Sequence, residues 1–250
     1  MERGPGARAT LLRLLHLSAP LFFLWLDCLA AGTALSVLAG RWRRAGPRLI
    51  AMGAQLFTVW GEVLQQKYYF TTAWEEVTSL SKLSGCCTSA RSADDKKHQF
   101  FTSVVFPLSL TVSINFWAVY WLDPALLEDL GILQEYVTPS LNHSLHTGIV
   151  VVPLLELLLN PELVFPEEVW PAAAIKVIFA YGVFSMPLAI VCPGCVYPFS
   201  RNLSTPQRFL FMLVNMSLSV AIYGAEKRLY RMIWGRVDGS SRRSNGLKLS

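Results

Sequence analysis

Long apolar stretches, separated by short polar segments, recur along the chain. Several of these stretches approach the roughly 20 residues that an α-helix needs to cross a bilayer. The pattern therefore predicts an all-α protein, a polytopic membrane bundle of about six transmembrane helices. The expected spans are residues 17–38, 49–64, 100–122, 148–159, 170–192 and 209–224.

Polar residues inside these spans indicate which helical faces meet other helices. Asp27 lies in the first span, where a carboxylate is expected to face protein rather than lipid. In the second span Gln55, Thr58 and Glu62 recur three and then four residues apart, so one helical face is polar. That face either forms hydrogen bonds between helices or lines a pocket.

The segments between the spans are polar or amphipathic. Residues 75–99 form the most polar internal stretch and are predicted to be an exposed loop in which His98 is solvated. His16 is expected at the membrane interface. Residues 124–139 place leucines and a tyrosine near helical spacing with acidic residues between them, which predicts a short amphipathic helix on the membrane surface.

The composition agrees with a membrane location. Hydrophobic residues make up 53% of the 250 residues and charged residues 16%, and the mean hydropathy is +0.40. Soluble domains carry roughly 25% charged residues. The net charge of +5 comes from flanks and loops, as expected for topology signals and anionic lipid headgroups. The membrane is therefore an expected partner, and nucleic acid is not.

The distribution of basic residues predicts the orientation. Six spans place both termini on one side, and that side collects the first arginines, the cationic 82–97 loop and the basic C-terminal tail. The positive-inside rule then favours cytosolic termini, although residues 41–48 are also basic. We expect a membrane domain over residues 1–235 and a disordered cytosolic tail over residues 236–250. We expect this membrane to be that of the endoplasmic reticulum or the plasma membrane.

A histidine-rich motif, Ser-Leu-Asn-His-Ser-Leu-His-Thr, occupies residues 140–147 directly before the fourth span. Asn142 and His143 would lie near the mouth of that helix and His146 about one turn deeper, because residues three apart share a face. A histidine at the rim of a bilayer core can exchange protons near neutral pH. The motif is therefore a candidate site, and helix capping is the alternative.

Glu156 lies ten residues beyond His146, which is about 2.8 helical turns and about 15 Å along the axis. The two side chains share roughly one face. They are too far apart for direct contact, unless a water or another helix links them.

Several kinds of chemistry find little support. No G-x-S-x-G elbow is present. A zinc site needs three or four ligands, which His143, His146 and Glu156 could supply only with much distortion. The Cys192-Pro-Gly-Cys195 segment lacks a second cysteine pair or a nearby histidine. No metal and no cofactor are predicted, and a histidine base that activates a hydroxyl nucleophile needs the fewest groups.

The motif resembles the LNHxMHT motif of the androgen-induced gene 1 and androgen-dependent TFPI-regulating protein family. Other landmarks of that family occur in the same order. They are Phe106-Pro107, Phe116-Trp117, Glu156, Val196-Tyr197-Pro198-Phe199, Gly224-Ala225-Glu226-Lys227 and Trp234-Gly235. The resemblance covers about residues 100–235 and implies a multi-span membrane hydrolase of fatty acid esters of hydroxy fatty acids.

The resemblance also implies the general base, because the second histidine of the motif is His146. We expect Asn142, His143 and Glu156 to bind substrate or orient this base. The family's nucleophile is a threonine near the start of the second span, about seven residues before a glutamine.

Gln55 places that threonine position at Arg48, which has no hydroxyl. Thr58 is the nearest threonine but lies further along the span. The nucleophile is therefore unassigned, and a second function stays open.

The favoured function is a hydrolase whose substrate is a lipid ester. The alternative is a non-catalytic member that binds lipid or regulates a partner protein. A transporter is less favoured because no internal repeat is visible, and the oligomeric state is not predicted.

Overall fold

Helices dominate the part of the chain that the computed structural model describes, which comprises residues 6–28, 57–81, 90–123, 143–165, 172–191, 200 and 202–246. No strand occurs in these residues, and the predicted all-α fold is confirmed. The helices are Gly6–Cys28, α2 (Phe57–Ser81), α3 (Ala90–Phe100), α4 (Phe106–Leu122), α7 (Ile149–Leu159), α8 (Ala172–Val191) and α9 (Thr205–Gly246). Two π-helical turns, η1 (Phe101–Val105) and η3 (Ser144–Gly148), precede α4 and α7.

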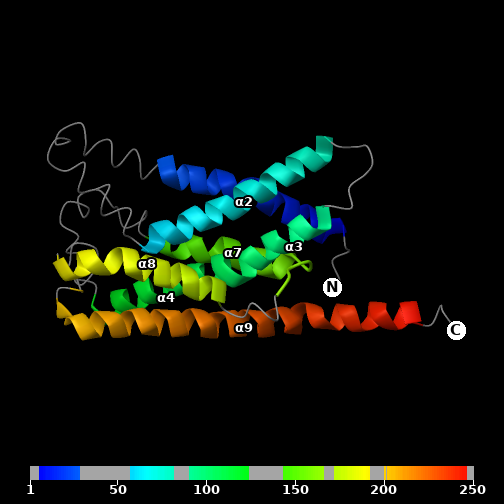
Figure 1. Cartoon of the computed structure of the whole chain (residues 1–250). Helices are drawn as coiled ribbons and strands as arrows, with labels where there is room; N and C mark the ends of the chain where they lie inside the picture. Colours follow the sequence, from blue (N-terminus) through cyan, green and yellow to red (C-terminus); the bar gives the residue numbers. More distant parts are fainter. Residues whose placement is uncertain are drawn as a thin grey trace.

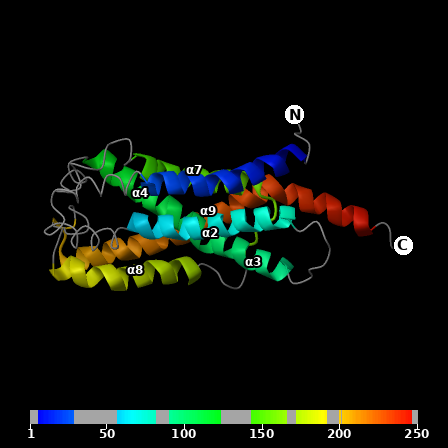
Figure 2. The ribbon, with the colours of Figure 1, turned by 90° about the horizontal axis from the view of Figure 1, so that it is seen from above.

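The helices run lengthwise, side by side, in one elongated bundle (Figures 1 and 2). Both termini lie at the same end of the bundle, as an even number of crossings requires (Figure 1). We call this the terminal end. The opposite, distal end holds the start of α2, the end of α4 and the start of η3.

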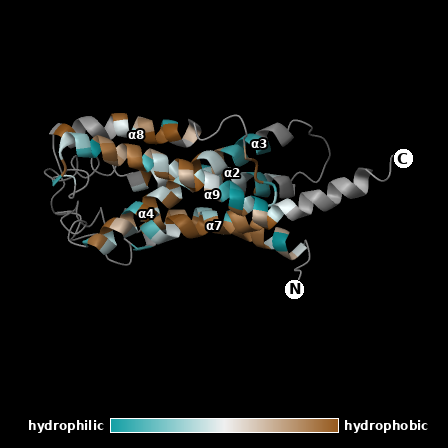
Figure 3. Cartoon of the chain, turned by 90° about the horizontal axis from the view of Figure 1, so that it is seen from below, coloured by the Kyte–Doolittle hydropathy of each residue, from teal (hydrophilic) through white to brown (hydrophobic). Residues whose placement is uncertain are grey.

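Three helices are long and apolar enough to cross a membrane, judged by length and composition. They are Gly6–Cys28, Asp94–Leu122 and Thr205–Gly235, and Leu145–Leu159 is a shorter apolar helix. Figure 3 shows hydrophobic residues along much of α7 and α8. Large apolar side chains also point outward on other helices, such as Trp74, Trp121 and Met232.

Polar side chains are buried between the helices. The hydroxyls of Thr111 on α4 and Ser219 on α9 lie 2.7 Å apart. One turn further along, the Asn115 amide donates to Asn215 of α9. An apolar exterior with polar contacts between helices is typical of bundles in lipid, in agreement with the membrane protein that the sequence predicts.

The N-terminal helix and α2 differ from the spans that the sequence predicts. The N-terminal helix begins at Gly6 rather than near residue 17, and α2 continues to Ser81 rather than ending near residue 64. Residues 29–56 and the predicted amphipathic helix 124–139 lie outside the described residues. Asp27 accepts a hydrogen bond from Gln66 of α2 at 2.9 Å, so it faces protein as predicted.

The prediction of an exposed loop over residues 75–99 is wrong. α2 extends through the start of this segment and α3 begins at Ala90. Lys97 of α3 donates to the Glu75 carboxylate of α2, so opposite charges join the two helices instead of facing water. His98 is consequently buried rather than solvated. At the other end of the chain, α9 continues to Gly246 and includes most of the predicted tail.

α2 and α7 run in the same direction and pack in a fixed register. Thr58 contacts His146, and Tyr68 contacts Glu156; the two partners are 88 residues apart in both pairs. A shift of one residue between the helices would break both contacts.

Gln65 fixes this register between the two pairs. Its Nε2 donates to the Ile149 carbonyl at 2.7 Å and to the Ser109 hydroxyl of α4. The residue four positions after Ile149 is Pro153, which has no N–H with which to bond that carbonyl. Gln65 therefore supplies the donor that Pro153 removes from α7.

Two glycines allow the helices to approach closely at the same level. A Cβ on Gly61 of α2 would lie 3.3 Å from Cδ1 of Ile149, and a Cβ on Gly148 would lie 2.8 Å from Cζ of Phe22. A larger residue at Gly148 would therefore displace the Phe22 ring. Glycine at these positions brings α2 and the N-terminal helix against the segment that carries His146.

Candidate functional site

A threonine and a histidine meet at the distal end of the bundle. Thr58 lies in the first turn of α2, and His146 lies in the middle of η3. Thr58 Oγ1 is 3.2 Å from His146 Nε2, and both side chains are half-buried. In the tautomer whose Nε2 carries no proton, the threonine hydroxyl donates to the ring. This is the geometry in which a histidine base activates a hydroxyl nucleophile.

Aromatic rings of α4 hold the two histidines of the motif. The Phe116 ring stacks on His146 with 3.7 Å between centroids and 12° between planes. The next residue, Trp117, stacks on His143 with 5.0 Å between centroids. These contacts fix the plane of each imidazole, so that Nε2 of His146 points to α2.

The π-helical turn η3 distributes its side chains between two sides. π-helical turns are rare and occur frequently at functional sites. Within η3, His146 faces α2 and α4, whereas Thr147 and Gly148 face the N-terminal helix. The turn therefore places the base beside a second feature, a groove.

The groove has a volume of about 510 Å³ and lies between the N-terminal helix and the η3–α7 segment. Its lining residues are Phe22, His143, Thr147, Gly148, Val151 and Val152. The lining is polar near the motif and apolar further along α7. We call it the α7 groove.

A different polar cluster occupies the terminal end. Glu156 is fully buried and accepts hydrogen bonds from Tyr68 at 2.9 Å, from Asn160 at 2.8 Å and from Nε2 of His16 at 2.9 Å. The other ring nitrogen of His16 lies 3.4 Å from Glu76. Because carboxylates only accept, both nitrogens of His16 are placed to donate, as in a protonated imidazole. We call these five residues the glutamate cluster.

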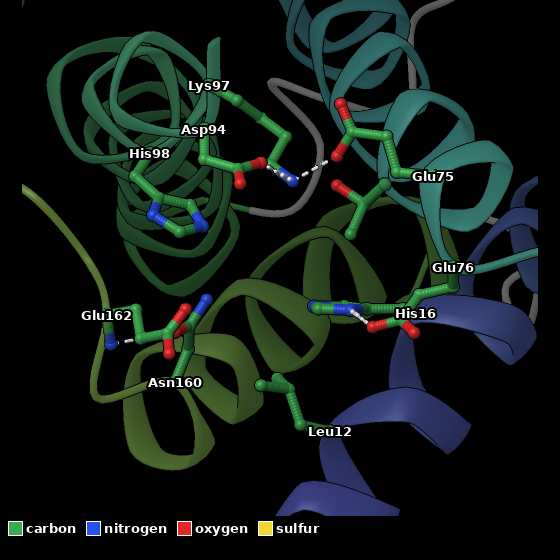
Figure 4. Close-up of a pocket in the computed structure, with 10 residues that line it drawn as sticks. Leu12, His16, Glu75, Glu76, Asp94, Lys97, His98, Asn160 and Glu162 are labelled. Carbon is green, nitrogen blue, oxygen red and sulfur yellow. Dashed lines mark hydrogen bonds and ion pairs between the residues drawn. The ribbon is translucent and has the colours of Figure 1, made fainter. Parts of the chain in front are cut away.

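A polar cavity of about 220 Å³ adjoins the glutamate cluster. Figure 4 shows its lining from four segments: the N-terminal helix, α2, α3 and the residues after α7. Lys97 lies in it between the carboxylates of Glu75 and Asp94. Charge pairs across this cavity therefore join the N-terminal helix to α2 and α2 to α3.

The predicted site residues fall into different places. His146 pairs with Thr58, and His143 lines the α7 groove. Asn142 lies outside the described residues. Glu156 belongs to the glutamate cluster, whose contacts are those of a carboxylate that joins helices; its binding of substrate stays a prediction. α2 contacts both His146 and Glu156, so another helix links them, one of the two links that the sequence allowed.

No group of three His, Cys, Asp or Glu side chains gathers as metal ligands within the described ranges. The arrangement at the distal end instead offers a hydroxyl, a base and an adjacent groove. A hydroxyl beside a base can attack an acyl carbon.

Sequence reasoning did not find Thr58 as the partner of His146. Counting back seven residues from Gln55 reaches Arg48, which has no hydroxyl. The same count from Gln65 reaches Thr58, and the contact between Thr58 and His146 favours this second glutamine. The proline at position 153 was the available signal, because a proline inside an apolar helix leaves a carbonyl that a buried glutamine can bond.

The comparisons with known proteins agree with the resemblance in the motif. The model of the FAR-17a/AIG1-like protein family matches residues 49–231. The chain is 27% identical over 135 residues to the androgen-dependent TFPI-regulating protein of Mesocricetus auratus, over 54% of this chain and 58% of that protein. It is 24% identical over 191 residues to the human protein of that name, over 76% and 81% of the two chains.

The chain thus spans little more than half the length of the Mesocricetus auratus protein and of the Rattus norvegicus protein, 58% in both cases. No solved structure matches the chain.

Proposed function

The chain belongs to the FAR-17a/AIG1-like protein family, and from this premise we propose that it is a membrane-embedded hydrolase of lipid esters. One observation carries the proposal: Thr58 Oγ1 lies 3.2 Å from Nε2 of His146 in a half-buried position at one end of the bundle. A hydroxyl and a base at this distance are the minimum that nucleophilic ester cleavage needs. The adjacent α7 groove supports a lipid as the substrate.

The roles of the two residues follow from their chemistry. Thr58 Oγ1 attacks the ester carbonyl carbon while Nε2 of His146 accepts the hydroxyl proton. The tetrahedral intermediate collapses, the bond between the carbonyl carbon and the leaving oxygen breaks, and His146 returns the proton to that oxygen. The product alcohol leaves an acyl-threonine.

Water completes the cycle. His146 accepts a proton from the water as its oxygen attacks the acyl-threonine carbonyl. The bond to Thr58 Oγ1 breaks, the threonine recovers its proton from His146, and a fatty acid departs. Each turnover consumes one water and leaves both residues unchanged.

Fatty acid esters of hydroxy fatty acids are the substrate class that the family resemblance favours. Such an ester has an acyl chain on one side of the scissile bond and a second, carboxyl-bearing chain on the other. With cytosolic termini, as the basic residues predict, the distal end and its Thr58–His146 pair face the lumenal or external side.

Turnover by the full-length protein in detergent micelles tests the proposal, with a fatty acid ester of a hydroxy fatty acid as substrate. Thr58→Ala should lower kcat/KM by about 10³-fold, within the range for lost nucleophile activation. Thr58→Ser keeps a hydroxyl and should retain a measurable fraction. A fluorophosphonate probe should label the peptide that contains Thr58 in the wild type and not in His146→Ala.

Thr71→Ala is the matched control on the same helix. Its hydroxyl is exposed and bonds the Lys67 carbonyl at 2.7 Å, far from His146, so turnover should not change. Absence of turnover by the wild type, or full turnover by Thr58→Ala, would overturn the proposal.

A non-catalytic, lipid-binding member is the second candidate. The relatives are named for regulating another protein, TFPI, and not for a reaction. The α7 groove could hold lipid whether or not Thr58 reacts. Saturable binding of the labelled ester by a wild-type protein that does not cleave it would favour this candidate.

A further inference from the structure

The lining of the α7 groove changes from polar to apolar along its length. This matches the acyl group of an ester, which has a carbonyl at one end and a hydrocarbon chain at the other. His143, Thr147 and Val151 are each four residues apart and therefore form one stripe on the helix face. Leu155 continues the stripe and is exposed. The stripe thus begins with two groups that can hydrogen-bond and continues with hydrocarbon.

The polar beginning of the stripe adjoins the Thr58–His146 pair. Thr147 follows His146 directly, and His143 stacks on Trp117, whose neighbour Phe116 stacks on His146. An ester carbonyl at His143 and Thr147 is therefore held by the same short segment that carries the base, next to His146 along the chain. The hydrocarbon chain attached to that carbonyl can then extend along the apolar part of the groove.

Phe22 and Gly148 set the depth of the groove. A Cβ at Gly148 would lie 2.8 Å from Cζ of Phe22, so the ring rests directly on the backbone of η3. Phe22 is held there by the ring of Phe23, 5.5 Å away, and by Trp25. The floor of the groove is consequently aromatic and apolar, and its volume of about 510 Å³ lies among those of pockets for small ligands.

We propose that the α7 groove binds the fatty acyl chain of the ester, with the carbonyl end at His143 and Thr147 and the hydrocarbon along Val151 and Val152. The proposal rests on the proposed hydrolase function for its substrate class. It adds that Val151 determines selectivity for long acyl chains. Both segments that flank the groove carry exposed apolar side chains, such as Leu21 and Leu155, so the chain enters from the lipid.

Val151→Trp is the informative variant, because a bulky ring at this exposed position fills the groove without disturbing buried packing. Acetyl and palmitoyl esters of the same alcohol are compared in the full-length protein. The kcat/KM of the palmitoyl ester should fall about tenfold or more, as expected when hydrophobic pocket contacts are lost. The acetyl ester is too short to reach Val151, so its kcat/KM should change less than about twofold.

Val183→Trp is the matched control. Val183 is an exposed valine on α8, another outward-facing helix, and its replacement should change neither rate. Photolabelling with a diazirine-bearing palmitic acid gives a second measurement that needs no turnover. Crosslinks should concentrate on peptides that contain Phe22 or residues 147–152, and Val151→Trp should remove them while Val183→Trp should not.

The outcomes separate the two proposals. Equal loss for both esters in Val151→Trp, or no loss for either, overturns the acyl groove while the hydrolase stands. A wild type that cleaves neither ester overturns the hydrolase proposal. The photolabelling result alone then tests whether the groove binds a fatty acyl chain. Crosslinks spread evenly over all outward-facing helices would mean that bulk lipid alone contacts this face, and would overturn the groove.

Discussion

The two polar clusters lie at opposite ends of the α2–α7 pair and differ in how their polar groups are surrounded. At the terminal end, Glu156 is 0% exposed and accepts hydrogen bonds from three different side chains. At the distal end, Thr58 and His146 are half-buried, His146 stacks on Phe116, and the next residue, Thr147, lines a groove. The same pair of helices supports both.

The difference teaches what separates a structural polar group from a reactive one in a membrane bundle. A buried carboxylate whose two oxygens both accept hydrogen bonds stabilises the packing, and a ligand would have to displace those bonds to reach it. A half-buried base that contacts a hydroxyl near a groove can pass a proton to a reacting molecule. The two ends thus differ in burial and in charge pairing, and this difference in access separates a structural role from a reactive one.

Each cluster contains one histidine, which provides the sharpest comparison. His146→Ala should lower kcat/KM by about 10³-fold and cost less than about 1.5 kcal/mol of stability, the size of one lost aromatic stack. His16→Ala should reduce stability by about 3–5 kcal/mol, because it leaves the buried carboxylate of Glu156 without its cation. Thermal unfolding and turnover of both variants in the same detergent give the two values.

The activity of His16→Ala is the control for this contrast. At a temperature where the variant is still folded, its kcat/KM should stay within a few-fold of the wild type. If His16→Ala were as inactive as His146→Ala while folded, the two clusters would act as one catalytic unit and the comparison would fail.

Two neighbouring tyrosines sharpen the comparison within the terminal end. Both rings are fully buried, and the Tyr68 hydroxyl donates to Glu156 at 2.9 Å. The Tyr69 hydroxyl has no hydrogen-bond partner among the residues with described positions. Tyr68→Phe should therefore cost about 1.5–3 kcal/mol, the value of a bond to a charged group, whereas Tyr69→Phe should be neutral or slightly stabilising.

The free energy of unfolding of these two variants is the measurement, and each is the size control for the other. Equal losses would mean that ring packing, not the bond to Glu156, explains the effect. In that case the glutamate cluster would contribute less to stability than its contacts suggest.

The sequence predicted the helices better than the contacts between them. Apolar stretches are visible locally, so the all-α membrane fold and the shared end of the two termini followed from them. The partners of His16 and Lys97 did not, because His16 and Glu156 are 140 residues apart and Lys97 meets a residue on another helix. Periodicity indicates which residues share a face of one helix. It does not indicate which face of another helix packs against that face.

The same limit explains why the sequence did not predict the contact between Thr58 and His146. The motif showed that His146 was a candidate base, and the polar face of the second span included Thr58. Only the packing of α2 on η3 joins the two, and Gln65 holds that packing from inside the bundle. The seven-residue spacing reaches a hydroxyl from Gln65 and not from Gln55, but only the packing shows that this hydroxyl meets His146.

The smallest predicted effect concerns the hydrogen bond from Gln65 to the Ile149 carbonyl, which lies between the two clusters. Gln65→Leu removes the donor to the Ile149 carbonyl, which α7 itself cannot bond because residue 153 is proline, so it should cost about 1–3 kcal/mol. Pro153→Ala restores an N–H four residues after Ile149, so in that background Gln65→Leu should cost about 1 kcal/mol less, a coupling typical of groups that share a partner. A double-mutant cycle of unfolding free energies measures this coupling, and the Pro153→Ala single variant corrects for the altered flexibility of the unfolded chain. Strict additivity would show that Gln65 stabilises the bundle through Ser109 alone, and the register that brings Thr58 to His146 would then have to come from the close packing at Gly61 and Gly148.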